Sequence, residues 1–111
     1  MSGGDWIRYT PTIMHDSYGQ VGVPGSRVAK TALFDALAEI AKAMSTGRRV
    51  EIIDLLAQGE RSVDAIATEI GQSLANTSHH LRSLAQAGLV CSRREGTYIY
   101  YRLASTEVIL T

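Results

Sequence analysis

The sequence contains a single cysteine, two prolines and no long hydrophobic run. Cys91 cannot form a disulfide within the chain and cannot build a zinc site alone, so a reducing, cytoplasmic setting is expected. No stretch of about 18 apolar residues is present, so we expect no membrane-spanning helix. The first residues have no basic region followed by an apolar segment, so no secretory signal is expected either.

The chain also lacks net charge, with 11 basic and 11 acidic residues, but these are unevenly distributed. Residues 28–70 have five basic and seven acidic side chains, a net charge of −2. Residues 71–103 have four arginines and one glutamate, a net charge of +3. Phosphate binding depends on local potential, so such a chain can still bind DNA. Chance unevenness in a small protein is the alternative.

With 111 residues, the chain is long enough for one small domain. Residues 1–26 contain both prolines and five of the ten glycines, which predicts a partly flexible amino-terminal extension. Trp6 and Met14 are nevertheless too apolar for a fully solvated tail and would dock on this chain or on a second copy. We assign residues 27–111 to the domain itself.

Helical periodicity begins at Val28, after which apolar residues recur every four positions as far as Met44. Thr46 is placed to cap a second helix that Gly59 would end. Ser62 is placed to cap a short third helix. Gly71 then permits a tight turn, and Ser73 is placed to cap a fourth helix from Leu74 to Ala87.

The period becomes alternating in "LVCSRREGTYIYYRL", residues 89–103. Leu89 and Cys91 precede the polar run "RREG", and Ile99, Tyr101 and Leu103 follow it at alternate positions. This pattern predicts a β-hairpin with "RREG" as its turn. The predicted fold is therefore mainly α with a small β-hairpin.

Two short helices joined by a glycine turn form a helix-turn-helix, whose second helix can enter the DNA major groove. In the fourth helix Thr77, Leu81 and Leu84 would pack inward. Asn76, His79 and Arg82 would then face outward, with Ser73 at the exposed end. The hairpin that follows would be a wing with Arg93 and Arg94 at its tip.

The pattern "S-x-x-x-x-S-H-H-L-R-x-L-x-x-A-G-L-V", from Ser73 to Val90, and the following "RREG" and "YYRL" resemble the arsenic-repressor (ArsR/SmtB) family. The resemblance covers residues 33–103. It implies a winged helix-turn-helix with a three-helix core and wing, preceded by a dimerisation helix. It implies a homodimeric repressor that leaves its DNA operator when an inducer binds or a thiol is modified. By resemblance, the recognition-helix positions are Ser73, Asn76, Ser78, His79, His80 and Arg82, and the wing positions are Arg93, Arg94 and Tyr98.

The adjacent His79 and His80 raise the question of a metal site. Neighbouring residues on a helix point about 100° apart, so these two side chains are poorly placed to grip one ion. Zinc-binding helices place histidines four residues apart instead. DNA contact or local hydrogen bonding is the favoured interpretation, with His79 the better candidate for the groove and His80 for a bond within the domain.

Metal and thiol sensing occur in the family that the chain resembles, but its usual ligands are absent here. Ser62 and Asp64 occupy the positions of the family's Cys-x-Cys pair, and the end of the chain, "STEVILT", has no histidine. We therefore expect no metal and no cofactor, with His15 and Asp16 left as a minor alternative. Cys91 is expected to be a small buried apolar residue, and a redox role through an intermolecular disulfide stays open.

No phosphate loop, nucleophile–base spacing or acidic pair indicates an enzyme. The favoured function is thus a DNA-binding transcriptional regulator without catalytic activity, acting on double-stranded operator DNA. One alternative is a winged-helix module that binds protein. Another is the DNA-binding part of a longer regulator with a second domain, because the last helix of the family's dimers is missing or short here. The inducer cannot be deduced from the sequence.

Overall fold

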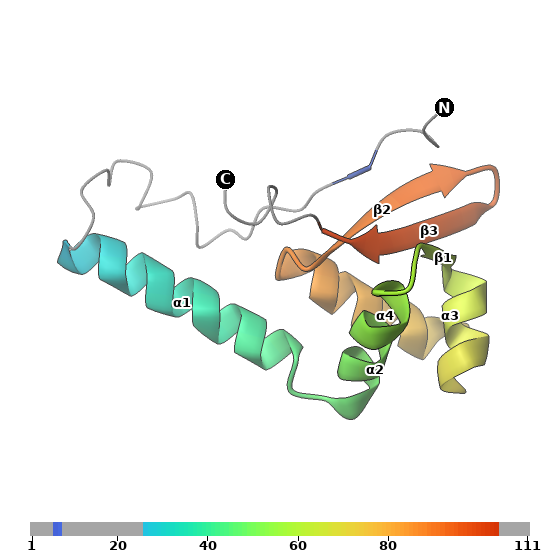
Figure 1. Cartoon of the computed structure of the whole chain (residues 1–111), viewed down its shortest axis with the longest axis horizontal. Coiled ribbons are helices and arrows are strands. Elements are labelled where there is room, and N and C mark those ends of the chain that lie inside the picture. Colours follow the sequence, from blue (N-terminus) through green and yellow to red (C-terminus); the bar gives the residue numbers. More distant parts are fainter. Residues whose placement is uncertain (1–5, 8–25, 105–111) are drawn as a thin grey trace.

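The computed structural model describes residues 6–7 and 26–104, and Figure 1 shows how they are arranged. Several predictions concern residues outside these ranges: the apolar Met14, the alternative metal ligands His15 and Asp16, and the terminal residues 105–111. The division into an extension and a domain stays a prediction.

The described residues form four helices, each of which begins directly after a serine or threonine. They are α1 (Arg27–Ala43), α2 (Gly47–Leu56), α3 (Val63–Ile70) and α4 (Leu74–Gln86). The capping hydroxyls of Ser26, Thr46, Ser62 and Ser73 each accept a hydrogen bond from the backbone N–H three residues later, at 3.0 to 3.2 Å. These bonds satisfy donors that the first turn of a helix leaves unpaired. The predicted caps at residues 46, 62 and 73 are confirmed.

The sheet has the predicted hairpin and one further strand. The hairpin strands are β2 (Val90–Glu95) and β3 (Tyr98–Leu103), and the two-residue β1 (Arg61–Ser62) pairs with the other side of β3. The strand order is β1-β3-β2, all antiparallel. The predicted turn was wrong in its position: most of "RREG" belongs to β2, and the reversal occurs at Gly96 and Thr97.

The core lies where α2, α3 and α4 pack against one another and against the sheet (Figure 1). Ile52, Ile66, Leu81, Leu84 and Val90 have no more than 1% of their surface exposed. Burying each such side chain stabilises the fold by about 1.5–3 kcal/mol. These positions come from all three helices and from β2, so the core fixes α4 relative to the wing.

Helix α1 projects away from this core (Figure 1). Among its 17 residues only Ala43 is buried, while Leu33, Phe34 and Leu37 are 55%, 63% and 52% exposed. The predicted first helix is therefore confirmed, shifted by one residue at each end. Neither α1 nor any other helix in the described part of the chain is long and apolar enough to cross a membrane.

The short segment Trp6–Ile7 docks on this chain, which was one of the two predicted alternatives. Ile7 and Ser92 exchange backbone hydrogen bonds, at 2.7 Å for the Ile7 N–H and 3.4 Å for the Ser92 N–H. The Trp6 ring lies 4.5 Å from the guanidinium of Arg102 and 5.2 Å from that of Arg93. The segment therefore covers part of the free edge of β2.

Candidate nucleic-acid interface

The turn between α3 and α4 sets the angle at which α4 leaves the core. Gly71 has a left-handed conformation with φ of 68°. The Gly71 N–H donates to the Thr68 carbonyl at 3.3 Å, and the Gln72 N–H donates to the Ala67 carbonyl at 3.0 Å. This is the Schellman arrangement that ends helices at glycine. Because Ser73 caps α4 at once, only three residues separate the two helices.

The two sides of α4 differ sharply in burial. Thr77, Leu81 and Leu84 are fully buried, as predicted. The exposed residues on the remaining surface are Leu74, Ala75, Asn76, His79, Arg82 and Gln86, and Ser78 and Ser83 are partly exposed. A helix anchored on one side, with short polar groups and one arginine on the other, is suited to approach base edges in a major groove.

The predicted recognition-helix residues do not all have free side chains. Asn76, His79 and Arg82 are exposed. Ser73 is exposed as well, but its hydroxyl already accepts the Asn76 N–H at 3.0 Å. Asn76 also approaches Gln72, with 3.5 Å between Nδ2 and Oε1. Ser78 is only half exposed.

His80 is engaged within the domain rather than pointing freely outward. Its Nδ1 accepts a hydrogen bond from Arg49 Nε on α2, at 3.0 Å, which requires that Nδ1 has no proton. Burial lowers the pKa of His80, and the positive charge of Arg49 and the neighbouring His79 lower it further. In the described part of the chain, no three His, Cys, Asp or Glu side chains come together as a metal site would need.

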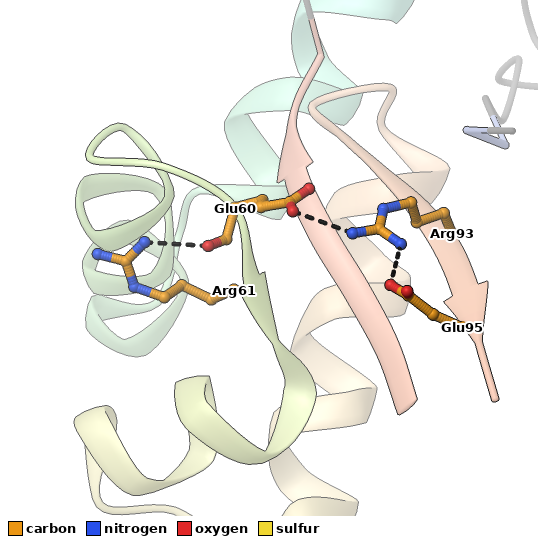
Figure 2. Close-up of polar contacts among 4 residues, drawn as sticks. All are labelled: Glu60, Arg61, Arg93 and Glu95. Carbon is orange, nitrogen blue, oxygen red and sulfur yellow. Dashed lines mark hydrogen bonds and ion pairs between the residues drawn. The ribbon is translucent and has the colours of Figure 1, made fainter. Parts of the chain in front are cut away.

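The wing differs from its prediction at Arg93. Its side chain is only 7% exposed and lies on the face of the sheet rather than at the tip (Figure 2). Its Nη1 is 2.6 Å from Glu95 Oε1, and its Nη2 is 3.0 Å from Glu60 Oε2. It also stacks over the ring of Tyr100 at 4.6 Å. Placing Arg93 at the wing tip was therefore wrong, because the side chain is held by carboxylates of its own chain.

Arg94 and Tyr98, the other two predicted wing residues, remain accessible. Arg94 is exposed and its Nε donates to the Gly96 carbonyl at 3.3 Å, so it lies beside the turn. Tyr98 is 52% exposed at the start of β3. Cys91 has 1% of its surface exposed, in agreement with the prediction of a small buried apolar residue.

Sequence reasoning missed two features of this surface. Arg49 contacts the recognition helix from α2, and nothing in its local sequence indicates a partner 31 residues away. Leu74 and Ala75 are exposed in the first turn of α4, although only polar side chains were sought there. The exposure of Ala75 was predictable from its spacing. It lies four residues before His79 and seven before Arg82, so it shares their face of the helix.

A helical core, a helix-turn-helix and a two-stranded wing together define the winged helix-turn-helix proteins. Residues 46–92 match the family described as "Bacterial regulatory protein, arsR family". The transcriptional repressor SdpR of Bacillus subtilis is 40% identical over 65 residues, which cover 59% of this chain and 72% of that protein. The chain belongs to the arsR family of bacterial regulatory proteins.

Two mycobacterial proteins are also similar. The HTH-type transcriptional regulator Rv0324 of Mycobacterium tuberculosis is 51% identical over 84 residues, covering 76% of this chain but only 37% of that protein. A solution NMR structure of the homodimeric winged helix-turn-helix DNA-binding domain of Mb0332 from Mycobacterium bovis is 50% identical. It has a TM-score of 0.70, and the match covers 78% of this chain and 80% of that one. The chain thus spans about a third of the length of Rv0324.

Proposed function

We propose that this chain is a homodimeric transcriptional repressor that binds an inverted-repeat DNA operator in the bacterial cytoplasm and is released by an unidentified inducer. The observation that carries the proposal is the division of α4 into a fully buried side and a side presenting Asn76, His79 and Arg82. Arg82 has the two donors that recognise guanine, and Asn76 has the donor and the acceptor that recognise adenine. The role is one of binding and involves no catalysis.

The exposed apolar side of α1 supports the homodimer. Leu33, Phe34 and Leu37 are exposed, and their spacing puts them on one side of α1. This helix projects from the core (Figure 1). The similar domain from M. bovis is described as homodimeric. A two-fold axis through such an interface would present two recognition helices to successive major grooves, about 34 Å apart.

Arg94 and Tyr98 on the wing would contact the DNA backbone beside each half-site. Both are exposed next to the turn of the hairpin, whereas Arg93 is held by carboxylates and is left out of the proposed interface. A phosphate contact contributes affinity without sequence preference. Arg94 is therefore proposed to strengthen binding to every duplex equally.

Ala75 is proposed to read a thymine. It lies on the exposed face of α4 with His79 and Arg82, but its methyl group makes no hydrogen bond. The only apolar group that a base pair displays in the major groove is the 5-methyl group of thymine. Replacing the thymines of a bound half-site by uracil should therefore weaken binding to the wild type and have less effect on Ala75→Gly.

The experiment starts by selecting bound duplexes from a random library with the full chain. Fluorescence anisotropy then compares a selected duplex with a scrambled one over a range of salt concentrations. Arg82→Ala should weaken binding to the selected duplex specifically. Arg94→Ala should weaken both and reduce the slope of log affinity against log salt by roughly one unit for each phosphate that is no longer neutralised. Lys42→Ala, at an exposed position on the side of α1 away from Leu37, is the control and should leave the slope unchanged.

Failure to enrich any duplex, with no binding at low salt, would overturn the proposed function. Enrichment with equal affinity of Arg82→Ala and the wild type would instead remove Arg82 from the base-reading residues. An unchanged salt slope in Arg94→Ala would exclude a phosphate contact from the wing.

A further inference from the structure

A hydrogen bond joins α2 to the recognition helix. Arg49 Nε donates to His80 Nδ1 at 3.0 Å, and both side chains are partly buried. This bond uses the donor nearest the aliphatic stem of Arg49 and fixes the plane of the guanidinium. The two terminal nitrogens, with their four N–H groups, carry much of the charge and take no part in it.

The charge of Arg49 is not cancelled within the described residues. Its neighbour Arg48 pairs with Glu51 at 3.1 Å, and Arg93 pairs with both Glu60 and Glu95. No carboxylate in residues 6–7 and 26–104 forms such a pair with Arg49. Its partner is an imidazole whose unprotonated Nδ1 accepts the bond, so the cation is oriented without being neutralised. A carboxylate at position 80 would orient the guanidinium too, but would cancel its charge.

The position of Arg49 in α2 is also unfavourable for a cation. It is the third residue of the helix, and the first turn contains no acidic residue. The amino-terminal end of a helix has a partial positive charge that disfavours arginine. When a charge lies in an unfavourable position and no group within the fold compensates it, a binding partner outside the fold is indicated. The partner that fits this charge is an anion.

His80 places this cation on the flank of the proposed DNA-reading surface. It is four residues after the exposed Asn76 and three before the partly exposed Ser83, so these side chains lie along one side of α4. The DNA backbone borders the major groove that α4 would enter. A guanidinium beside such a helix is suited to hold one phosphate with two parallel N–H bonds.

We propose that Arg49 binds a phosphate of the DNA backbone beside α4, and that His80 is the positioning residue that orients its guanidinium. This inference rests on the proposed function and adds to it a contact from α2, outside the helix-turn-helix and the wing. It also gives the paired histidines different roles: His79 faces the groove, and His80 acts through Arg49.

The test compares salt dependence among variants of the full chain, using the selected duplex and the scrambled duplex. Arg49→Gln should weaken binding to both by the same factor and reduce the slope of log affinity against log salt by about 0.9 for each protomer. His80→Leu, which removes the acceptor, should reproduce part of this loss. His80→Gln should restore wild-type binding, because its amide oxygen can accept the Arg49 bond. Lys42→Gln is the matched loss of an exposed cation, on the side of α1 away from Leu37, and should leave the slope unchanged.

Arg49→Lys provides a second measurement if Arg49→Gln folds poorly. It retains the charge but lacks the planar pair of donors, so the slope should stay near that of the wild type while affinity falls for both duplexes. Folded Arg49→Gln with the wild-type slope would overturn the inference and leave the proposed function intact. Equal binding by His80→Leu and His80→Gln would overturn the positioning role of His80. Absence of wild-type binding to every duplex would overturn the proposed function and this inference with it.

Discussion

Arg93 on β2 reaches Glu60 across the middle strand of the sheet, with 3.0 Å between Nη2 and Oε2 (Figure 2). Glu60 immediately precedes β1, so the pair connects the two outer strands over β3. Glu95 completes the arrangement, and the hydrogen bonds that Arg93 donates to both carboxylates raise the pKa of its guanidinium. The arginine is nearly buried, whereas the side chains of Glu60 and Glu95 are 44% and 65% exposed.

This asymmetry predicts which partner is harder to lose. Arg93→Met leaves two carboxylates that water can reach, while the thioether side chain still packs over Tyr100. Glu60→Gln combined with Glu95→Gln leaves a buried guanidinium without a counter-charge, which is the costlier defect. We therefore expect the double variant to be less stable than Arg93→Met in urea unfolding. Glu51→Gln, which breaks the exposed pair with Arg48, is the control and should change stability by less than about 1 kcal/mol. The reverse order would mean that packing of Arg93 outweighs its charge.

The Arg49–His80 bond predicts a pH-dependent stability. Burial and the charge of Arg49 lower the pKa of folded His80, so the unfolded chain binds this proton more readily. The stabilisation is complete above the pKa of His80 in the unfolded chain, which is about 6.5. It is lost as the pH falls through the lower pKa that His80 has in the folded chain. Losing the hydrogen bond should cost about 0.5–1.5 kcal/mol.

Urea unfolding at about pH 7.5 and about pH 5.5 tests this, since the two values lie on either side of the ordinary imidazole pKa. When the pH is lowered from the first value to the second, the free energy of unfolding should fall less in His80→Gln than in the wild type. His79→Gln removes only the smaller effect of a neighbouring charge on His80 and should reduce the pH dependence less than His80→Gln does. An identical pH dependence in His80→Gln would show that other groups cause it.

The helices were predictable because their signals are local. Thr46, Ser62 and Ser73 each precede an apolar periodic segment, and a cap needs only the N–H groups of the next turn. The inward residues Thr77, Leu81 and Leu84 followed from the same periodicity. Helix α4 was therefore predicted together with the side that faces away from the core.

The wing and the Arg49 contact depend on pairings between distant segments. The two residues of β1 are too few to show alternation, yet β1 brings Glu60 to the sheet, and Glu60 then holds Arg93. Local sequence alone would put both arginines of "RREG" near the solvent. Likewise, the bond between Arg49 and His80 depends on the packing of α2 against α4. Sequence reasoning thus proposed a surface for DNA but could not show which of its charged side chains already pair within the chain.

Gly71 is predicted to be required for the turn before α4. Its φ of 68° is a conformation that L-residues disfavour, although an added Cβ would meet no atom within 4 Å. Gly71→Ala should therefore lower the free energy of unfolding by about 1–2 kcal/mol through backbone conformation alone. Gly47→Ala is a matched control, because that site is equally open but lies in the first turn of α2. It should leave stability unchanged or raise it slightly. Equal losses in both variants would contradict this explanation.

The exposed apolar side of α1 predicts where the dimer can be broken. Leu37 is 52% exposed beside Leu33 and Phe34, so in the proposed homodimer it would be buried in the interface. Leu37→Glu places a carboxylate there in both copies, and burying an unpaired charge is strongly unfavourable. An interface position of this kind contributes at least about 2 kcal/mol, so the dimer dissociation constant should rise at least about 30-fold. Light scattering during gel filtration over a dilution series measures it.

Lys42→Glu is the control, because it puts the same carboxylate on the same exposed helix. Lys42 lies five residues after Leu37, about 140° away around the helix, on the side of α1 that also has Asp35. This variant should remain as dimeric as the wild type.

Since two half-sites are bound together only by a dimer, Leu37→Glu should also lose most of its affinity for an inverted repeat while each monomer stays folded. A folded, fully dimeric Leu37→Glu would place the interface elsewhere and leave the apolar side of α1 without its proposed partner.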